Sequence, residues 1–264
     1  MNFNDAMSAV RESASNTITI PEAWGQGRAT FGGMVAATMF ERIIPHIAQD
    51  RPVRSVMVSF VAPVAPGETD VIVKVLREGK AATQIQATAY QNDQPCAVLL
   101  ASFGGGRESA VTVAPGEAPA FKAPDAASAF PYIPGLTPEF TQHFDYRYTV
   151  GTIPFMGSDK TEMGGWIRLR EGSGQSVTVP EILALLDAWP PAVLSMLKKP
   201  AMGSSLTWAV SFVNTPEDCS AGDWWQYLAR IQSSAEGYSH IESTLWDKNG
   251  KVAVFSQQTV SVFG

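Results

Sequence analysis

Three polar side chains in the C-terminal half of the sequence are of the types needed to hold and activate a water molecule. Asp187 follows the apolar run 182–186, Ser205 opens a strand-like segment, and Gln257 lies in the last such segment. Ionising a carboxyl group among apolar neighbours is costly, so its pKa rises toward the range of a general base. A hydroxyl and an amide can hold the water from which that base takes a proton. The combination is of a kind that can orient a water molecule beside a general base.

Each of the three residues also has an ordinary structural interpretation. Asp187 precedes Pro190 and Pro191, and Asp is favoured as the N-cap of a helix that begins with proline. Gln257 can be a solvent-exposed side chain on an edge strand. Ser205 can simply begin a strand, and its spacing alone favours that interpretation. Position alone leaves both interpretations of Asp187 open.

An internal repeat is the feature that singles these residues out. Residues 53–61 and 205–213 share the sequence V-S-F-V, and each segment follows an apolar stretch and precedes a turn with Pro and Gly. Each half begins with a weak strand signal and continues after the turn with three segments that alternate in the manner of strands. The weak signals lie near 16–20 and 140–150, the apolar stretches are 32–47 and 177–197, and the later strands are 71–77, 82–91, 95–103, 224–232, 237–247 and 251–263.

Comparison of the two copies puts an apolar residue opposite each polar candidate. For Asp187, Ser205 and Gln257, the matching residues of the first copy are Met39, Val53 and Ala101. A polar residue where the other copy is apolar needs a physical reason. Because side chains alternate along a strand, Gln257 shares a face with Ala253 and Phe255. We predict that this face points inward.

The order of elements predicts an α+β fold in which antiparallel strands wrap an apolar central helix, which is the hotdog fold. Two copies would join their sheets edge to edge and thereby remove exposed edges, giving a double hotdog. Between the copies lies a segment rich in Ala, Gly and Pro, typical of a linker. We predict an N-terminal hotdog at 1–104, a linker at 105–138 and a C-terminal hotdog at 139–264. A single β-sandwich with an inserted loop is the alternative.

Composition restricts the classes of partner. The formal net charge is -6 and no basic run occurs, so nucleic acid and anionic membranes are not expected to bind. Only Cys96 and Cys219 are present, without a nearby histidine pair, which argues against a zinc site. The first residues do not resemble a signal peptide, and no apolar run reaches the ~18 residues of a membrane span. We therefore expect a soluble cytoplasmic protein.

Several short motifs resemble the medium-chain acyl-CoA thioesterase II family. The resemblance covers nearly the whole chain apart from the linker, and its motifs are 30–37, 54–63, 76–80, 186–187, 204–212, 237–238, 245–247 and 256–257. It implies a double hotdog that hydrolyses acyl-CoA to a free acid and coenzyme A, with no cofactor and no metal. The family's catalytic Asp, Thr or Ser, and Gln fall on Asp187, Ser205 and Gln257.

The resemblance and the helix start also suggest substrate-binding residues. Amides at the start of the glycine-led helix, near Gly32 and Gly33, can stabilise the negative charge that develops on a thioester carbonyl oxygen. Close packing of the helix on the sheet explains the same two glycines equally well. The family often has His where this sequence has Arg54, so Arg54 is a further substrate-binding candidate and a departure from the pattern.

Other functions have weaker support from the sequence. No G-x-S-x-G motif is present, so a serine hydrolase is not indicated. Hotdog hydratases use a histidine on the central helix, but His46, His143 and His240 all lie outside the second apolar segment. A non-catalytic acyl-CoA-binding protein is the main alternative, because of the Arg54 departure. The acyl-CoA thioesterase interpretation also implies a homo-oligomer, since hotdog sheets leave surfaces for pairing.

Overall fold

A computed structural model describes residues 1–48 and 51–263. One antiparallel sheet of 12 strands runs through the whole molecule in the order β1-β5-β6-β7-β4-β11-β14-β13-β12-β10-β9-β8. The N-terminal half contributes β1 (Thr17–Ile20), β4 (Val53–Phe60), β5 (Gly67–Glu78), β6 (Ala82–Gln91) and β7 (Gln94–Gly104). The C-terminal half contributes β8 (Ser128–Phe130), β9 (Phe144–Val150), β10 (Glu162–Leu169), β11 (Met202–Phe212), β12 (Trp225–Ala235), β13 (Tyr238–Trp246) and β14 (Val252–Phe263). A separate hairpin pairs β2 (Gly25–Gln26) with β3 (Ala29–Thr30).

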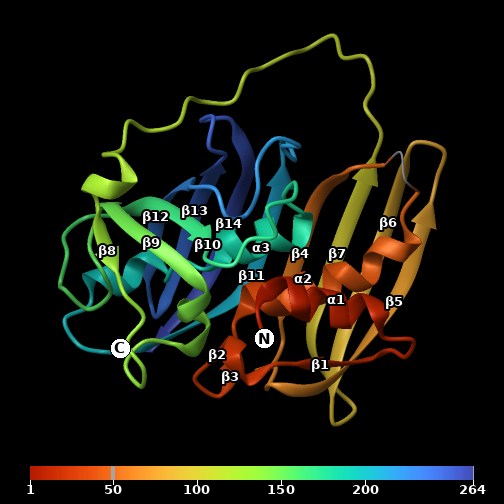
Figure 1. Ribbon diagram of the computed structural model, residues 1–264, viewed down its shortest axis with the longest axis horizontal. Coiled ribbons are helices and arrows are strands. Elements are labelled where there is room, and N and C mark those ends of the chain that lie inside the picture. Colours follow the sequence, from red (N-terminus) through yellow and green to blue (C-terminus); the bar gives the residue numbers. More distant parts are fainter. Residues whose placement is uncertain (49–50, 264) are drawn as a thin grey trace.

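The two repeats meet at the centre of this sheet. Strands β4 and β11, which carry the shared V-S-F sequence, pair antiparallel with Thr207 opposite Ser59 and Ser211 opposite Ser55. Figure 1 shows the two halves side by side across this seam. Each repeat therefore covers the strand edge that the other would expose, and the double hotdog prediction is confirmed.

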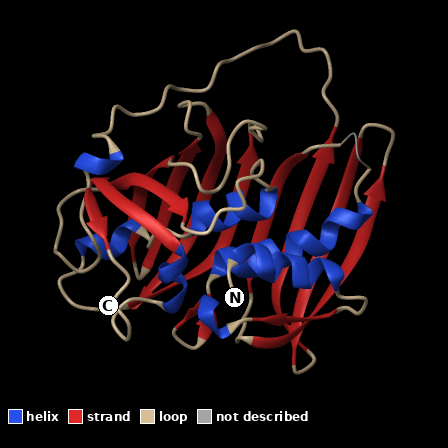
Figure 2. Ribbon diagram, viewed as in Figure 1, coloured by secondary structure: helices blue, strands red, loops and turns tan. Residues whose placement is uncertain are grey.

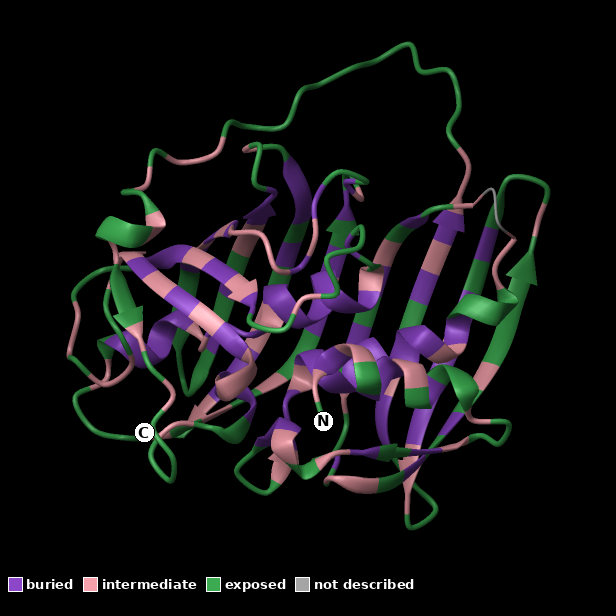
Figure 3. Ribbon diagram, in the orientation of Figure 1, coloured by how far each residue is buried: buried purple, intermediate pink, exposed green. Residues whose placement is uncertain are grey.

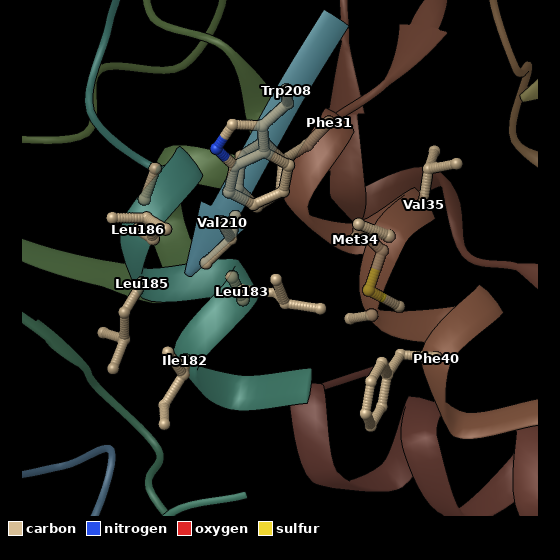
Figure 4. Packing of buried hydrophobic residues seen from close by; sticks show 14 of the residues in the cluster. Phe31, Met34, Val35, Phe40, Ile182, Leu183, Leu185, Leu186, Trp208 and Val210 are labelled. Carbon is tan, nitrogen blue, oxygen red and sulfur yellow. The ribbon is translucent and has the colours of Figure 1, made fainter. Parts of the chain in front are cut away.

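Three α-helices lie on one face of the sheet (Figures 1 and 2). They are α1 (Phe3–Glu12), α2 (Gly32–Ile43) and α3 (Val179–Asp187). Single turns of 3-10 helix are η1 (Glu22–Trp24), η2 (Ile44–His46), η3 (Pro124–Ala126), η4 (Glu139–His143) and η5 (Ala192–Met196). Helices α2 and α3 are almost entirely buried. Figure 4 shows their apolar side chains gathered against Trp208 and Val210 of β11.

Local sequence explains where α3 begins and ends. Thr178 and Glu181 form a capping box at its start, in which each side chain bonds the other's backbone amide. The helix stops at Asp187 because Pro190 and Pro191 follow, and residues before proline avoid the helical conformation. Asp187 is therefore the last residue of a buried helix. It does not cap the following turn η5, whose N-cap is Pro191.

One α-helix and two strands of the large sheet were not expected from the sequence. Helix α1 packs on α2, where Arg11 pairs with the buried Glu41 at 2.7 Å. Strand β10 lies between β9 and β12. Strand β8 falls inside the expected linker and pairs with β9, so the irregular part of the connection ends before it. Figure 1 shows that part arching over one end of the sheet.

One stretch, Val179–Met196, is apolar and long enough by composition to cross a membrane. In the fold it forms α3 and η5, and 67% of it is buried inside the protein. Its place at the centre of the hotdog core accounts for its composition.

Candidate active site

Asp187 lies where the end of α3 meets the start of α2. A Cβ atom added at Gly32 would lie 2.8 Å from Asp187 Oδ2, and one at Gly33 would lie 3.1 Å from Asp187 Cβ. The backbone N–H of Gly33 donates a hydrogen bond to the carboxylate. The two glycines are thus needed for this close approach of backbone to carboxylate, and both candidate positions join Asp187 in one cluster.

A glutamine from the C-terminal strand completes the cluster. Gln258 Nε2 donates a hydrogen bond of 2.7 Å to Asp187 Oδ1. Asp187 and Gln258 belong to the second repeat, whereas Gly32 and Gly33 belong to the first. The cluster therefore exists only when both repeats are folded together.

The surroundings of Asp187 change its proton affinity. Burial raises the pKa of the carboxyl to about 7, and the hydrogen bonds from Gln258 and Gly33 oppose that rise. The side chain keeps some exposed surface, although protein atoms surround the carboxyl closely. The close surroundings govern the pKa, because they remove most of the water that stabilises the ionised form. Asp187 is therefore poised to exchange a proton near neutral pH.

The prediction that the Gln257 side chain points toward the inside of the fold is wrong. Gln257 does lie on the same face as Phe255, but that face is the outer one, and both side chains are exposed. Gln258 points the other way, toward the helices, beside the buried Ser256 and Val260. Because side chains alternate along a strand, an error of one residue moves a side chain to the opposite face.

Strand register explains how the error arises. Val58 of β4 pairs with Leu99, and the equivalent Val210 of β11 pairs with Ser256. Two residues further along, Ala101 of the first repeat therefore corresponds to Gln258. Comparison of the copies was right that a glutamine replaces the buried Ala101. It selected the wrong one of two adjacent glutamines.

Ser205 reaches the inner face of the sheet through a β-bulge. The register between β11 and β14 shifts between Ser205 and Thr207, so that Ser205 pairs with the buried Val260. Ser205 is half-buried, and its partner Val260 is two residues along β14 from Gln258, on the same face of the sheet. No hydrogen bond joins its hydroxyl to Asp187 among the residues described. The structure thus places Ser205 on the same strand pair as Gln258, the residue that bonds the carboxylate.

Protein-family models match both halves of the chain. Residues 20–104 match the acyl-CoA thioesterase N-terminal domain, and residues 115–262 match the acyl-CoA thioesterase C-terminal domain. The chain belongs to the acyl-CoA thioesterase family. Among curated proteins, none matches this sequence.

Solved structures agree with this family in fold. A conserved hot dog protein of unknown function from Alicyclobacillus acidocaldarius has 20% identity and a TM-score of 0.86, with 98% of each chain covered. A putative thioesterase II from Thermobifida fusca has 17% identity and a TM-score of 0.81 over 99% of this chain and 97% of that one. An acyl-CoA thioesterase II from Mycobacterium marinum has 16% identity and a TM-score of 0.76 over 98% and 99%. At these identities the likeness concerns the fold alone.

Arg54 does not join the cluster in this member of the acyl-CoA thioesterase family. Its side chain is exposed, and its Nε donates a hydrogen bond of 2.8 Å to the carbonyl of Gly104. Phe60, at the other end of β4, is the residue that contacts the Gly32 position. Arg54 and Phe60 are six residue steps apart along the strand, which is roughly 20 Å. The departure from the family pattern at Arg54 is thus remote from Asp187.

An aromatic cluster holds the chain immediately after Asp187. Tyr146 donates a buried hydrogen bond of 3.1 Å to the carbonyl of Ala188. Trp189 stacks on Tyr227 with ring centroids 5.1 Å apart, and its ring meets Tyr148 at 4.8 Å. Such packed aromatic contacts restrict the position of the helix end. In the sequence, the only sign that these aromatic residues fix the end of α3 was that Trp189 lies two residues after Asp187.

Two cavities of the described residues lie away from Asp187. One of about 170 Å³ is lined by Asn2, Phe3, Gln142, His143, Leu169, Arg170 and Glu171. Another of about 140 Å³ lies on the outer face of the sheet and is lined by Ser55, Met57, Leu76, Gln84, Ile85, Leu100, Ala101 and Ser102. Neither contributes to the carboxylate site.

Proposed function

We propose that this member of the family hydrolyses an acyl-CoA thioester to a free acid and coenzyme A by direct attack of water. The observation that carries the proposal is the pairing of Asp187 with Gln258 at the start of α2, with the carboxyl pKa raised to about 7. A carboxylate with this pKa can take a proton from water near neutral pH and return it within one turnover.

The first step forms a tetrahedral intermediate. Ionised Asp187 accepts a proton from the attacking water while the water oxygen bonds to the thioester carbon. Gln258 holds the carboxylate in place, and Ser205 supplies a hydroxyl on the same face of the sheet to position the water. Negative charge then develops on the former carbonyl oxygen.

The start of α2 stabilises that charge. The first amides of a helix have no intrahelical acceptor, and the helix dipole is positive at this end. The Gly33 amide already serves Asp187, so the Gly32 amide is the donor we assign to the oxyanion. When the intermediate collapses, the carbon–sulfur bond breaks, and the proton on Asp187 passes to the departing thiolate. Atoms and charge then balance, and Asp187 is again ionised.

The alternatives lose support from the same geometry. A binding-only protein was suggested by Arg54, whose exposed side chain is remote from the carboxylate. A hydratase would need a histidine beside the site. Instead, His46 ends η2, His143 stacks on Trp24 at 4.1 Å, and His240 is exposed on β13.

Release of free thiol from a series of acyl-CoAs of different chain length tests the proposal. We expect turnover with at least one substrate, and a fall of ~100-fold or more in kcat for Asp187→Asn. Asp159→Asn is a matched control, because that carboxylate is exposed and its side chain lies on a loop. Thiol release by Asp187→Asn at the rate of the unsubstituted protein would show that another group is the base.

A further inference from the structure

Two polar groups in the aromatic cluster beside Asp187 are buried without a hydrogen-bond partner. They are the indole N–H of Trp189 and the hydroxyl of Tyr148, which find no partner among the residues that the structure describes. The two side chains are only 4% and 7% exposed. In the same cluster the Tyr146 hydroxyl is satisfied, because it donates to the carbonyl of Ala188. Buried polar groups are nearly always hydrogen-bonded in proteins, so two neighbouring exceptions need a physical reason.

The register of the sheet brings the two groups together. Tyr227 of β12 pairs with Gly165 of β10, and Gly165 pairs with Tyr148 of β9, so these residues form one row across three strands. Gly165 has no side chain, and a Cβ atom there would collide with the backbone of Arg147. The Trp189 ring contacts both tyrosines of the row, with centroids 5.1 Å from Tyr227 and 4.8 Å from Tyr148. Figure 3 shows buried residues alternating with partly exposed ones along β9, where Tyr148 is on the buried side.

The chain that follows Asp187 forms the wall between the solvent and this cluster. Asp187, Pro190 and Pro191 keep exposed surface, whereas Ala188 and Trp189 are buried. Two residues of chain span at most about 7 Å. The two unpaired groups therefore begin within reach of the first carbons of an acyl chain whose thioester is held at Asp187. Because both groups are closed off from solvent in the free protein, the acyl chain must displace neighbouring side chains to meet them.

We infer that the Trp189 N–H and the Tyr148 hydroxyl bind an oxygen atom on the acyl chain, so that the site prefers acyl groups with a neutral hydroxyl or keto oxygen near the thioester. This inference rests on the proposed hydrolysis at Asp187. An indole N–H can only donate, so its partner must be an acceptor. Burial raises the pKa of the Tyr148 hydroxyl, which therefore keeps its proton at neutral pH. A plain alkyl chain would leave both groups unpaired in the complex, whereas an oxygen would satisfy them.

The charges around the cluster restrict the oxygen to a neutral group. Burial raises the pKa of the Tyr227 hydroxyl and the charge of Asp187 adds to that rise, so the carboxylate acts on the cluster. The guanidinium of Arg170, which acts on Tyr146, is paired with Asp145 at 3.0 Å. A carboxylate on the acyl chain would be repelled by ionised Asp187. A hydroxyl or keto oxygen accepts the same hydrogen bonds without that repulsion.

Thiol release from octanoyl-CoA, and from octanoyl-CoA with a hydroxyl or keto oxygen on the third or fifth carbon, tests the inference. We expect kcat/KM for at least one oxygenated ester to exceed that for octanoyl-CoA about tenfold. Tyr148→Phe removes only the hydroxyl and should lower this ratio by ~3-fold or more. Tyr238→Phe is the matched control, because that ring is 50% exposed, and it should keep the ratio. Equal kcat/KM for plain and oxygenated esters, or an unchanged ratio in Tyr148→Phe, would overturn the inference.

Thermal unfolding of Tyr148→Phe without ligand gives a readout that is independent of activity. Because the hydroxyl has no partner in the free protein, its removal should raise the Tm or leave it unchanged. A lower Tm would show that the hydroxyl is already satisfied, for example by a buried water molecule. That result would also overturn the inference.

Binding to Asp187→Asn separates this inference from the proposed reaction. If the unsubstituted protein releases thiol from none of the esters, the hydrolysis proposal fails by itself. Calorimetric titration of Asp187→Asn with the same esters should still give a Kd about tenfold lower for an oxygenated ester than for octanoyl-CoA. Tyr148→Phe added to Asp187→Asn should reduce that difference. Equal Kd values for plain and oxygenated esters in Asp187→Asn would overturn the assignment of Trp189 and Tyr148, whatever the fate of the reaction.

Discussion

At the scale of single residues, the ionisation of Asp187 sets the pH range of the proposed reaction. The base must be ionised to accept a proton from water, and its pKa is raised to about 7. We expect kcat/KM to rise about tenfold per pH unit below that value and to level off above it. A pH profile measured at low substrate concentration checks this. A profile that is already flat at pH 5 would mean that the carboxylate stays ionised in the free enzyme.

The two adjacent glutamines provide a second test at this scale. Gln258→Ala removes the hydrogen bond that holds Asp187 and that lowers its pKa. We expect kcat to fall ~10- to 100-fold and the rising limb of the pH profile to move to higher pH. Gln257→Ala is the matched control, because its side chain is exposed on the outer face. Equal losses in both variants would contradict the assignment of Gln258.

At the scale of elements, the site depends on how closely the start of α2 approaches the end of α3. A Cβ atom at position 32 would meet Asp187 Oδ2 at 2.8 Å and Phe60 at 3.2 Å. Gly32→Ala should therefore displace the carboxylate, with a loss of ~10- to 100-fold in kcat and of ~1–3 kcal/mol in stability. Gly106→Ala, where nothing lies within 4 Å, should change neither. Normal kinetics of Gly32→Ala would show that this approach is not needed.

At the scale of the whole molecule, the same carboxylate weakens the fold as pH rises. The pKa of Asp187 is about 7 when folded, against ~3.9 when unfolded. Between these values only the folded state holds the proton, so stability falls as pH rises from ~4 to about 7 and stays lower above. The partial exposure of Asp187 limits this loss of stability to the order of a few kcal/mol at most.

Asp187→Asn should consequently stabilise the protein at pH 8, because asparagine cannot ionise and can still accept the bonds from Gln258 and Gly33. The gain in Tm, about 2–4 °C per kcal/mol for a chain of this size, should shrink to nothing near pH 4. Thermal unfolding of Asp187→Asn and Asp159→Asn at both pH values measures the difference. A variant that is less stable than the unsubstituted protein at pH 8 would contradict the buried carboxylate.

Much of the fold was predictable because it is encoded locally and encoded twice. Strand β6 has the bounds predicted from its alternation, and the V-S-F sequence identified β4 and β11 as equivalent. Strand β10 escaped prediction, because Gly164 and Gly165 interrupt its pattern where the β12 and β9 backbones approach closely. Helix α1 is short, and its place is decided by packing against α2. Such elements depend on neighbours that the local sequence does not contain.

By itself, the sequence determined the duplication, the antiparallel architecture and the unusual carboxylate at position 187. These follow from patterns of residue type within a few turns or strands. Only the tertiary structure decided that Gln258 and not Gln257 meets Asp187, that Gly32 and Gly33 lie against it, and that Arg54 is remote. The physical reason is that register and bulges between strands far apart in the chain are set by hydrogen bonds across the sheet. One residue of register reverses the direction of a side chain, and no local pattern records it.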